Sequence, residues 1–134
     1  MTVVLDSNAA IEIVLKRENG QRLGELIGNA EKTISSELFR IEVANVVGKY
    51  CHGNYVKKSE CGKILELAEN LVDEFMPIKE NHMEAMNDAI RLCHSAYDML
   101  YLTLARRTGA TLVTLDRRLN AIAEKEGINI IHFG

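Results

Sequence analysis

The chain has 134 residues, of which 47% are hydrophobic and 26% are charged, and its formal net charge is -3. This length predicts one domain with a core that needs no disulfides, and the composition is typical of a soluble globular protein. No stretch approaches the roughly 20 apolar residues of a membrane span, and we identify no signal peptide. The charge gives no overall basic signal for nucleic acid, although a bound metal ion can supply positive charge where a phosphate docks.

The three cysteines, Cys51, Cys61 and Cys93, are odd in number and lack C-x-x-C spacing. This pattern favours a reduced, cytoplasmic protein. Two of them form Cys-His pairs with His52 and His94, which makes zinc an alternative. Because adjacent side chains diverge on a helix, packed thiols beside surface histidines are the better interpretation.

The first half of the chain alternates short apolar runs with helical periodicity. In chain order we expect a strand at residues 2–5, helices at 9–16 and 21–27, a strand at 33–35 and a long helix at about 37–51. Ser7 or Asn8 is available to cap the first helix, and Ser35 and Ser36 precede the long one. Gly53-Asn54 then breaks the chain.

The second half repeats this alternation. We expect a helix at 57–72, a short strand at 75–78, helices at 81–93 and 96–108, a strand at 111–115, a helix at 119–126 and a last strand at 128–133. Pro77 suits an edge strand, and Gly109 suits the position just after a helix. Strands that alternate with helices predict an α/β domain with a mostly parallel sheet, in which ligands bind at the carboxyl ends of strands.

Three of the five aspartates lie next to apolar residues in the sequence. Asp6 follows the run Val3-Val4-Leu5, Asp116 follows Leu112-Val113-Thr114-Leu115, and Asp98 heads an apolar stripe on its helix. A buried carboxylate is costly unless something pairs with it, so the three predict one acidic site for a hard divalent cation. Taken singly, Asp6 and Asp116 also fit turns or helix caps, and Asp98 fits an exposed first-turn residue favoured by the helix dipole.

A fourth acid must come from the fourteen glutamates, and Glu42 is the best candidate because most of its neighbours are apolar. Glu12 and Glu37 are alternatives that read more easily as solvated helical residues. Glu42 alone also fits a charge at the edge of a packed face. Carboxylates that converge without a metal raise one another's pKa, and a metal relieves that repulsion.

Four blocks of the sequence resemble the PIN-domain family, in particular the VapC-type toxin ribonucleases. The blocks are Val4-Leu5-Asp6-Ser7-Asn8, Glu42-Val43-Ala44-Asn45-Val46, Tyr97-Asp98-Met99-Leu100-Tyr101-Leu102-Thr103-Leu104-Ala105 and Leu112-Val113-Thr114-Leu115-Asp116-Arg117-Arg118-Leu119. No single block is specific, but their order and spacing cover essentially the whole chain.

The resemblance implies a single domain over residues 1–134 with a three-layer α/β/α fold and a mostly parallel, about five-stranded sheet. It also implies RNA cleavage that depends on Mg²⁺ or Mn²⁺, often by a homodimer that a small antitoxin holds inactive. The implied metal and catalytic residues are Asp6, Glu42, Asp98 and Asp116, with Ser7, Asn8 and Thr114 as supporting polar groups.

Arg40 and Arg118 are the preferred candidates for contacts with the RNA backbone, because they are close in sequence to Glu42 and Asp116. Lys49 and Arg117 are further candidates. The simpler interpretation of each is an ordinary solvated charge.

Other classes of protein fit less well. A receiver domain needs an adjacent acidic pair after its first strand, and a haloacid-dehalogenase-type phosphatase needs an aspartate where Asn8 stands. A PIN-like domain that binds metal, RNA or a partner but cleaves poorly stays open as an alternative, as does a housekeeping ribonuclease.

Overall fold

Four parallel strands form the centre of the computed structural model, which describes residues 1–132. They are β1 (Thr2–Leu5), β2 (Lys32–Ser36), β3 (Glu74–Met76) and β4 (Thr111–Val113), in the order β3-β2-β1-β4. Val4 of β1 lies opposite Ile34 on one side and Leu112 on the other. A central parallel strand is covered on both faces, which explains why Val3, Val4 and Leu5 are all apolar and fully buried.

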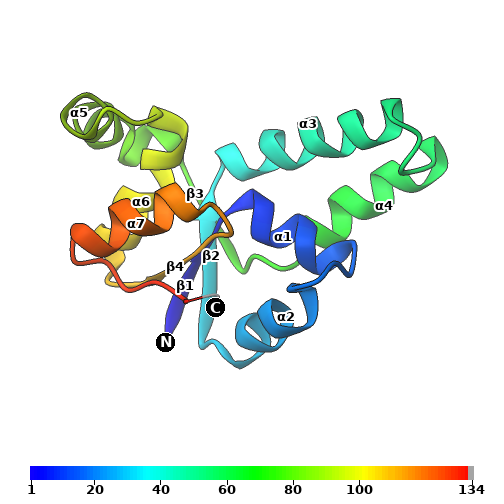
Figure 1. Cartoon of the computed structure of the whole chain (residues 1–134), viewed down its shortest axis with the longest axis horizontal. Coiled ribbons are helices and arrows are strands. Elements are labelled where there is room, and N and C mark those ends of the chain that lie inside the picture. Colours follow the sequence, from blue (N-terminus) through cyan, green and yellow to red (C-terminus); the bar gives the residue numbers. More distant parts are fainter. Residues whose placement is uncertain (133–134) are drawn as a thin grey trace.

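Helices cover both faces of this sheet and make three layers. They are α1 (Ser7–Val14), α2 (Gly20–Asn29), α3 (Leu38–His52), α4 (Lys58–Glu69), α5 (His82–Leu92), α6 (Ala96–Thr108) and α7 (Arg117–Lys125), with a short 3-10 helix η1 (Ile78–Glu80) before α5. Figure 1 shows α1 to α4 on one side of the sheet and α5 to α7 on the other, with α3 and α4 as a hairpin that extends away from the sheet. The expected three-layer α/β/α fold is confirmed.

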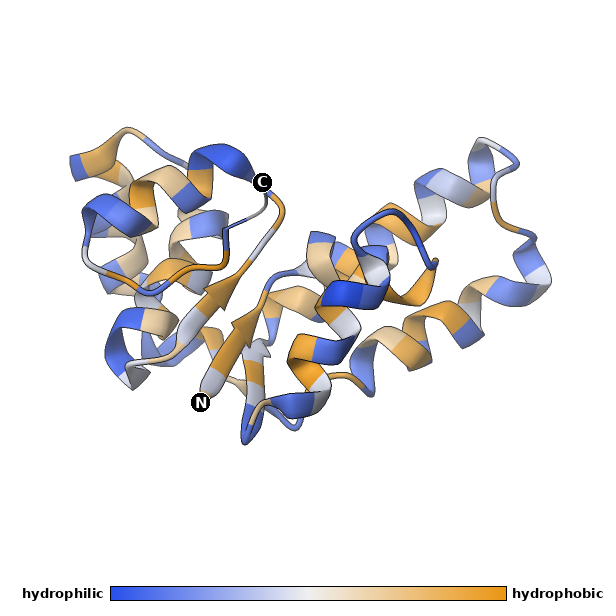
Figure 2. Ribbon diagram, turned by 60° about the horizontal axis from the view of Figure 1, so that its bottom comes forward, coloured by the Kyte–Doolittle hydropathy of each residue, from blue (hydrophilic) through white to orange (hydrophobic). Residues whose placement is uncertain are grey.

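The hydrophobic core is built around the central strands and helix α6. The central strands are largely hydrophobic, whereas the helices alternate between hydrophobic and hydrophilic residues (Figure 2). Helix α6 is the exception, because every residue from Met99 to Ala105 is buried. A helix buried on all sides is hydrophobic all round. Asp98 lies just before this buried stretch, in the first turn of α6.

The expected cap of α1 was wrong, because Asp6 fills that position rather than Ser7 or Asn8. The Asp6 carboxylate accepts the backbone N–H of Ser7 at 2.6 Å. Before α3 the cap position is taken by Glu37, although the Ser36 hydroxyl accepts the N–H of Leu38 at 3.2 Å. Helix α1 begins two residues before the expected position and α3 begins one residue after it, which is the usual uncertainty at helix ends.

The expected last strand at 128–133 forms only one bridge within the described residues, between Ile130 and Leu112. The N–H of Leu112 bonds to the carbonyl of Asn129, but this contact does not continue along β4 as a ladder. The sheet therefore has four strands in this part of the chain rather than about five, and Phe133 lies outside the described residues.

Helix α5 is present as expected, but a stripe of large apolar residues at helical spacing along it does not face the core. Met83, Met86 and Ile90 are all exposed, while Ala85 and Asp88 are buried. Within residues 1–132, no helix has both the length and the apolar character that crossing a membrane requires.

Candidate functional site

The predicted acidic residues gather at the carboxyl edge of the sheet. Asp6 directly follows β1 and Asp116 lies three residues after β4, and these two strands are parallel neighbours. Glu42 comes from the second turn of α3, and Asp98 comes from the first turn of α6. Four segments far apart in sequence therefore meet where parallel α/β sheets place their ligands.

Asp6 is the most deeply buried of these acids, with 4% of its surface exposed. One carboxylate oxygen accepts the backbone N–H of Ser7, and the other accepts the Thr114 hydroxyl at 2.7 Å. Burial raises the pKa of Asp6 to about 7, against the lowering effect of the Thr114 hydrogen bond. The nearby charges of Glu42 and Asp98 raise this pKa further, so the structure brings these three acids close together.

Glu42 is linked to Asp6 through Ser7. One Glu42 carboxylate oxygen lies 2.5 Å from the Tyr101 hydroxyl and 3.3 Å from the Ser7 hydroxyl, which is also 3.3 Å from Asp6. Ser7 has a single hydroxyl proton, so it donates to only one of the two acids at a time. Burial raises the pKa of Glu42, the hydrogen bonds from Tyr101 and Ser7 lower it, and the charge of Asp98 raises it.

Asp98 is more open than Asp6 and has a histidine as its partner. Its Oδ2 lies 2.8 Å from Nε2 of His94, four residues earlier in the chain.

The donors to Asp6 and Glu42 are all neutral groups, namely three hydroxyls and one backbone N–H. The three acids therefore lie close together with no lysine or arginine as a counter-charge among these donors.

Asp116 is linked to this cluster through Thr114. Its Oδ1 accepts the N–H groups of Arg118 and Leu119, so it caps α7. Its own N–H donates to the Thr114 hydroxyl, which in turn donates to Asp6. The helix-cap interpretation is thus correct for both Asp116 and Asp6, and for Asp6 it does not exclude membership of the acidic cluster.

The donor set fits a hard divalent cation. Over residues 1–132, no three His, Cys, Asp or Glu side chains are placed as a ready-made metal cage. Mg²⁺ rarely uses such a cage, because it keeps several waters and needs only one or two carboxylates. Burial, and then the neighbouring carboxylates, raise the pKa of Asp6 and of Glu42. Carboxylate oxygens are ligands that Mg²⁺ and Mn²⁺ prefer.

A family model of the PIN domain matches residues 3–125. The chain belongs to the PIN domain family. It is similar to Ribonuclease VapC3 of Pyrobaculum aerophilum, with 28% identity over 124 residues that cover 89% of this chain and 92% of that protein.

Solved structures share the fold of this PIN domain. PAE2754 from Pyrobaculum aerophilum matches with a TM-score of 0.72 and 22% identity, over 90% of this chain and 84% of that one. VapBC2 from Rickettsia felis, solved with a DNA fragment from the VapBC2 promoter, matches with a TM-score of 0.68 and 17% identity, over 98% of both chains.

The supporting polar residues of this PIN domain form one network. Asn8 donates from Nδ2 to the Thr114 hydroxyl at 3.2 Å and accepts the N–H of Leu115 at 3.0 Å. Asn120 donates from Nδ2 to the Thr114 carbonyl. Ser7, Asn8 and Thr114 are therefore all placed around Asp6, and Thr114 connects the strand end of Asp6 to the helix cap of Asp116.

Sequence reasoning missed Tyr101 and His94 as partners of the acids. The signal for Tyr101 was present, because it lies three residues after Asp98 on the same helical face, but it read as core. His94 was expected as a surface residue, yet only 6% of its side chain is exposed. That expectation was wrong because the turn between α5 and α6 folds His94 back onto Asp98.

The two candidate RNA-binding arginines make different contacts. Arg40 forms ion pairs with Glu37 and Glu69 and lies 3.9 Å from the centre of the Phe75 ring, so it holds α3 against α4 and β3. Arg118 is exposed and donates to the carbonyl of Cys93, next to His94 and Asp98. Of the two, Arg118 is better placed to reach a phosphate beside the acids.

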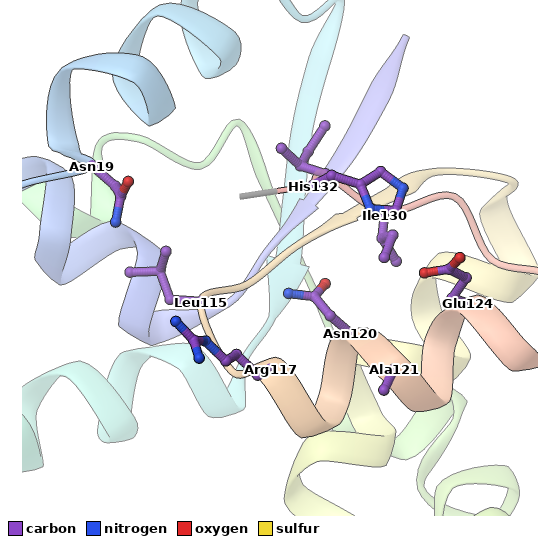
Figure 3. A pocket seen from close by; sticks show the side chains of 9 residues that line it. Asn19, Leu115, Arg117, Asn120, Ala121, Glu124, Ile130 and His132 are labelled. Carbon is purple, nitrogen blue, oxygen red and sulfur yellow. The ribbon is translucent and has the colours of Figure 1, made fainter. Parts of the chain in front are cut away.

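Two hollows flank the acids, and a larger one lies beside α7. A hollow of about 250 Å³ beside Glu42 is lined by Leu38, Ile41, Asn45 and Tyr97. Another of about 240 Å³ reaches Ser7 and Asn8. A hollow of about 640 Å³ lies between α7 and residues 130–132, where Arg117, Asn120, Glu124 and His132 line it (Figure 3). None of the four predicted acids lines this larger hollow, so its size does not mark the acidic site.

Proposed function

We propose that this PIN domain is a metal-dependent endoribonuclease and the toxin of a type II toxin–antitoxin pair. The observation that carries the proposal is the meeting of Asp6, Glu42 and Asp98 at the carboxyl edge of the sheet, with only neutral hydrogen-bond donors to Asp6 and Glu42. The similarity to Ribonuclease VapC3 supports RNA as the substrate.

Asp6, Glu42 and Asp98 would hold Mg²⁺ or Mn²⁺, with Asp116 next to them through Thr114. When bound, such an ion lowers the pKa of a water and stabilises the charge that develops on the phosphate. Because Asp6 has a pKa of about 7 without a cation, metal binding near neutral pH would release a proton from its carboxyl group.

The surrounding side chains orient the acids. Ser7 and Tyr101 direct one oxygen of Glu42, and Thr114 directs one oxygen of Asp6. Arg118 would bind the RNA backbone beside Asp98. Hydroxyl donors suit this task better than lysine or arginine would, because a built-in cation would compete with the metal for the carboxylates.

An antitoxin partner is supported by the likeness to VapBC2, and a segment that inserts near the acids would hold the enzyme inactive. The hollow beside Glu42 offers such a segment a path, because Ile41 and Tyr97 at its edge are each 65% exposed. We also propose the homodimer that the family resemblance implies, which light scattering of the purified chain would test.

The direct test is RNA cleavage with Mg²⁺, with EDTA, and with Mg²⁺ and the variant Asp98→Asn. We expect product only from the unmodified chain with Mg²⁺. Asp88→Asn is the matched control, because it makes the same substitution at an aspartate that is held by arginines instead. Equal activity in all arms would contradict the nuclease assignment.

A second readout separates the toxin from other roles. Expression of the unmodified chain should arrest growth of a bacterial host, and expression of Asp98→Asn should not. Tight Mn²⁺ binding and RNA retention without product would instead support a PIN-like binding domain with little nuclease activity.

A further inference from the structure

His94 contacts the acidic cluster although it is not one of the predicted site residues. Its side chain is 6% exposed, and its Nε2 lies 2.8 Å from Oδ2 of Asp98. Its other ring nitrogen, Nδ1, is buried with no hydrogen-bond partner among the described residues. An ionised carboxylate only accepts hydrogen bonds, so the Nε2–H of His94 is the donor in this contact.

The backbone holds this imidazole in place. Helix α5 ends at Cys93 in the left-handed conformation, with φ of 52°, and the N–H groups of Cys93 and His94 both bond to the carbonyl of Ala89. These bonds match a common way of ending a helix. The Arg118 guanidinium also donates to the Cys93 carbonyl, which ties the turn to α7. His94 is therefore fixed one turn before Asp98.

We infer that His94 is a positioning residue that holds the Asp98 carboxylate for metal binding. This inference rests on the proposed function. The hydrogen bond occupies Oδ2 and leaves Oδ1 as the Asp98 oxygen available to a cation. Asp6 is held by two donors, the N–H of Ser7 and the hydroxyl of Thr114. The orientation of the Asp98 carboxylate depends instead on His94.

Partners that orient metal-binding carboxylates contribute strongly to metal affinity. Losing one typically weakens binding by about 10–100-fold. His94→Leu removes the donor and keeps much of the volume, so we expect a loss of Mn²⁺ affinity in this range. His94→Gln places an amide N–H close to the position of Nε2 and should restore affinity to within about 3-fold of the unmodified chain.

The experiment is calorimetric titration of Mn²⁺ into the full chain without RNA, for the unmodified protein, His94→Leu, His94→Gln and Asp98→Asn. His52→Leu is the control, because His52 is exposed at the far end of the α3–α4 hairpin (Figure 1). Thermal melting of each variant, measured without metal, confirms that it folds.

Weak binding by His94→Leu with recovery in His94→Gln supports the inference. Unchanged affinity in His94→Leu, or equal losses in both His94 variants, overturns it. If Asp98→Asn binds Mn²⁺ as well as the unmodified chain, the proposed metal site itself is contradicted, and that result is distinct from a failure of His94 alone.

Discussion

Asp6 and Asp88 are both buried, yet their surroundings are opposite. Asp88, 6% exposed, accepts hydrogen bonds from Arg106 at 2.7 Å and from Arg91 at 3.1 Å. Burial raises the pKa of Asp88, but the two arginines outweigh that effect and hold it below its usual range. Asp6 has only neutral donors, and its pKa rises to about 7.

The difference separates a structural charge from a binding site. The negative charge of Asp88 is compensated inside the protein, within an ion-pair cluster that joins α5, α6 and Glu126 just after α7. The charge of Asp6 is not compensated by its donors, so it favours a cation from solution. A buried aspartate by itself therefore says little about function, whereas the charge of its partners says much.

The largest expected contrast is in catalysis. Asp6→Asn should lower RNA cleavage by more than about 100-fold, because it removes a charge that stabilises the reacting centre. Asp88→Asn should leave cleavage within about 3-fold at a temperature where it stays folded. Similar rates for the two variants in single-turnover assays would break the comparison.

The same two substitutions should move stability in opposite directions when metal is removed. A carboxyl group whose pKa rises from 3.8 to about 7 on folding is costly to keep ionised. At pH 8 with EDTA, Asp6→Asn should therefore stabilise the fold by up to about 4 kcal/mol, at about 1.4 kcal/mol for each tenfold change in acidity. Asp88→Asn should destabilise it by about 1–3 kcal/mol, because charged hydrogen bonds are lost. Urea unfolding measures both changes, and a loss of stability in Asp6→Asn would contradict the assignment of Asp6.

The raised pKa of Asp6 should also make the stability of the metal-free protein depend on pH. The folded pKa of Asp6, about 7, lies above its ordinary value of 3.8, so the folded state binds more protons between these limits. Its contribution to stability is therefore present at low pH and is lost as pH rises from about 4 to 7, by up to about 1.4 kcal/mol per pH unit. The difference between the unmodified chain and Asp6→Asn isolates this slope, and saturating Mn²⁺ should reduce it.

The smallest expected effect concerns the two arginines. Arg118→Ala should weaken RNA binding a few-fold and reduce the salt dependence of log affinity by about 0.7, as loss of one phosphate contact does on a single strand. Arg40→Ala should leave RNA affinity unchanged, because Arg40 is engaged by Glu37 and Glu69. Filter binding over a series of salt concentrations distinguishes them, and a salt-dependent loss in Arg40→Ala alone would reverse their roles.

Much of the fold was predictable, because strand β1 and helix α6 begin and end where their apolar patterns predict. The end of the sheet was not predictable, because the isoleucine-rich stretch at 128–131 has the composition of a strand, yet it meets β4 at a single bridge. The exposed stripe on α5 shows the same limit. Periodicity identifies a helix but does not say which of its faces meets the core.

The acids were predictable to different degrees. Apolar context singled out Asp6 and Asp98, and it also made Glu42 the best candidate among the fourteen glutamates, although Glu12 and Glu37 stayed as alternatives. Their partners were not predictable, because the Tyr101–Glu42 contact joins residues 59 positions apart and depends on side-chain direction. The same holds for Asp88, whose arginine partner at position 106 is invisible from its local sequence.

The central claim is that Asp6, Glu42 and Asp98 bind a divalent cation. Anomalous diffraction from crystals grown with Mn²⁺ tests it most directly. We predict a Mn²⁺ peak among these three carboxylates that is lost in Asp98→Asn and kept in Asp88→Asn. Ordered, fully resolved carboxylates with no peak between them at saturating Mn²⁺ would contradict the account.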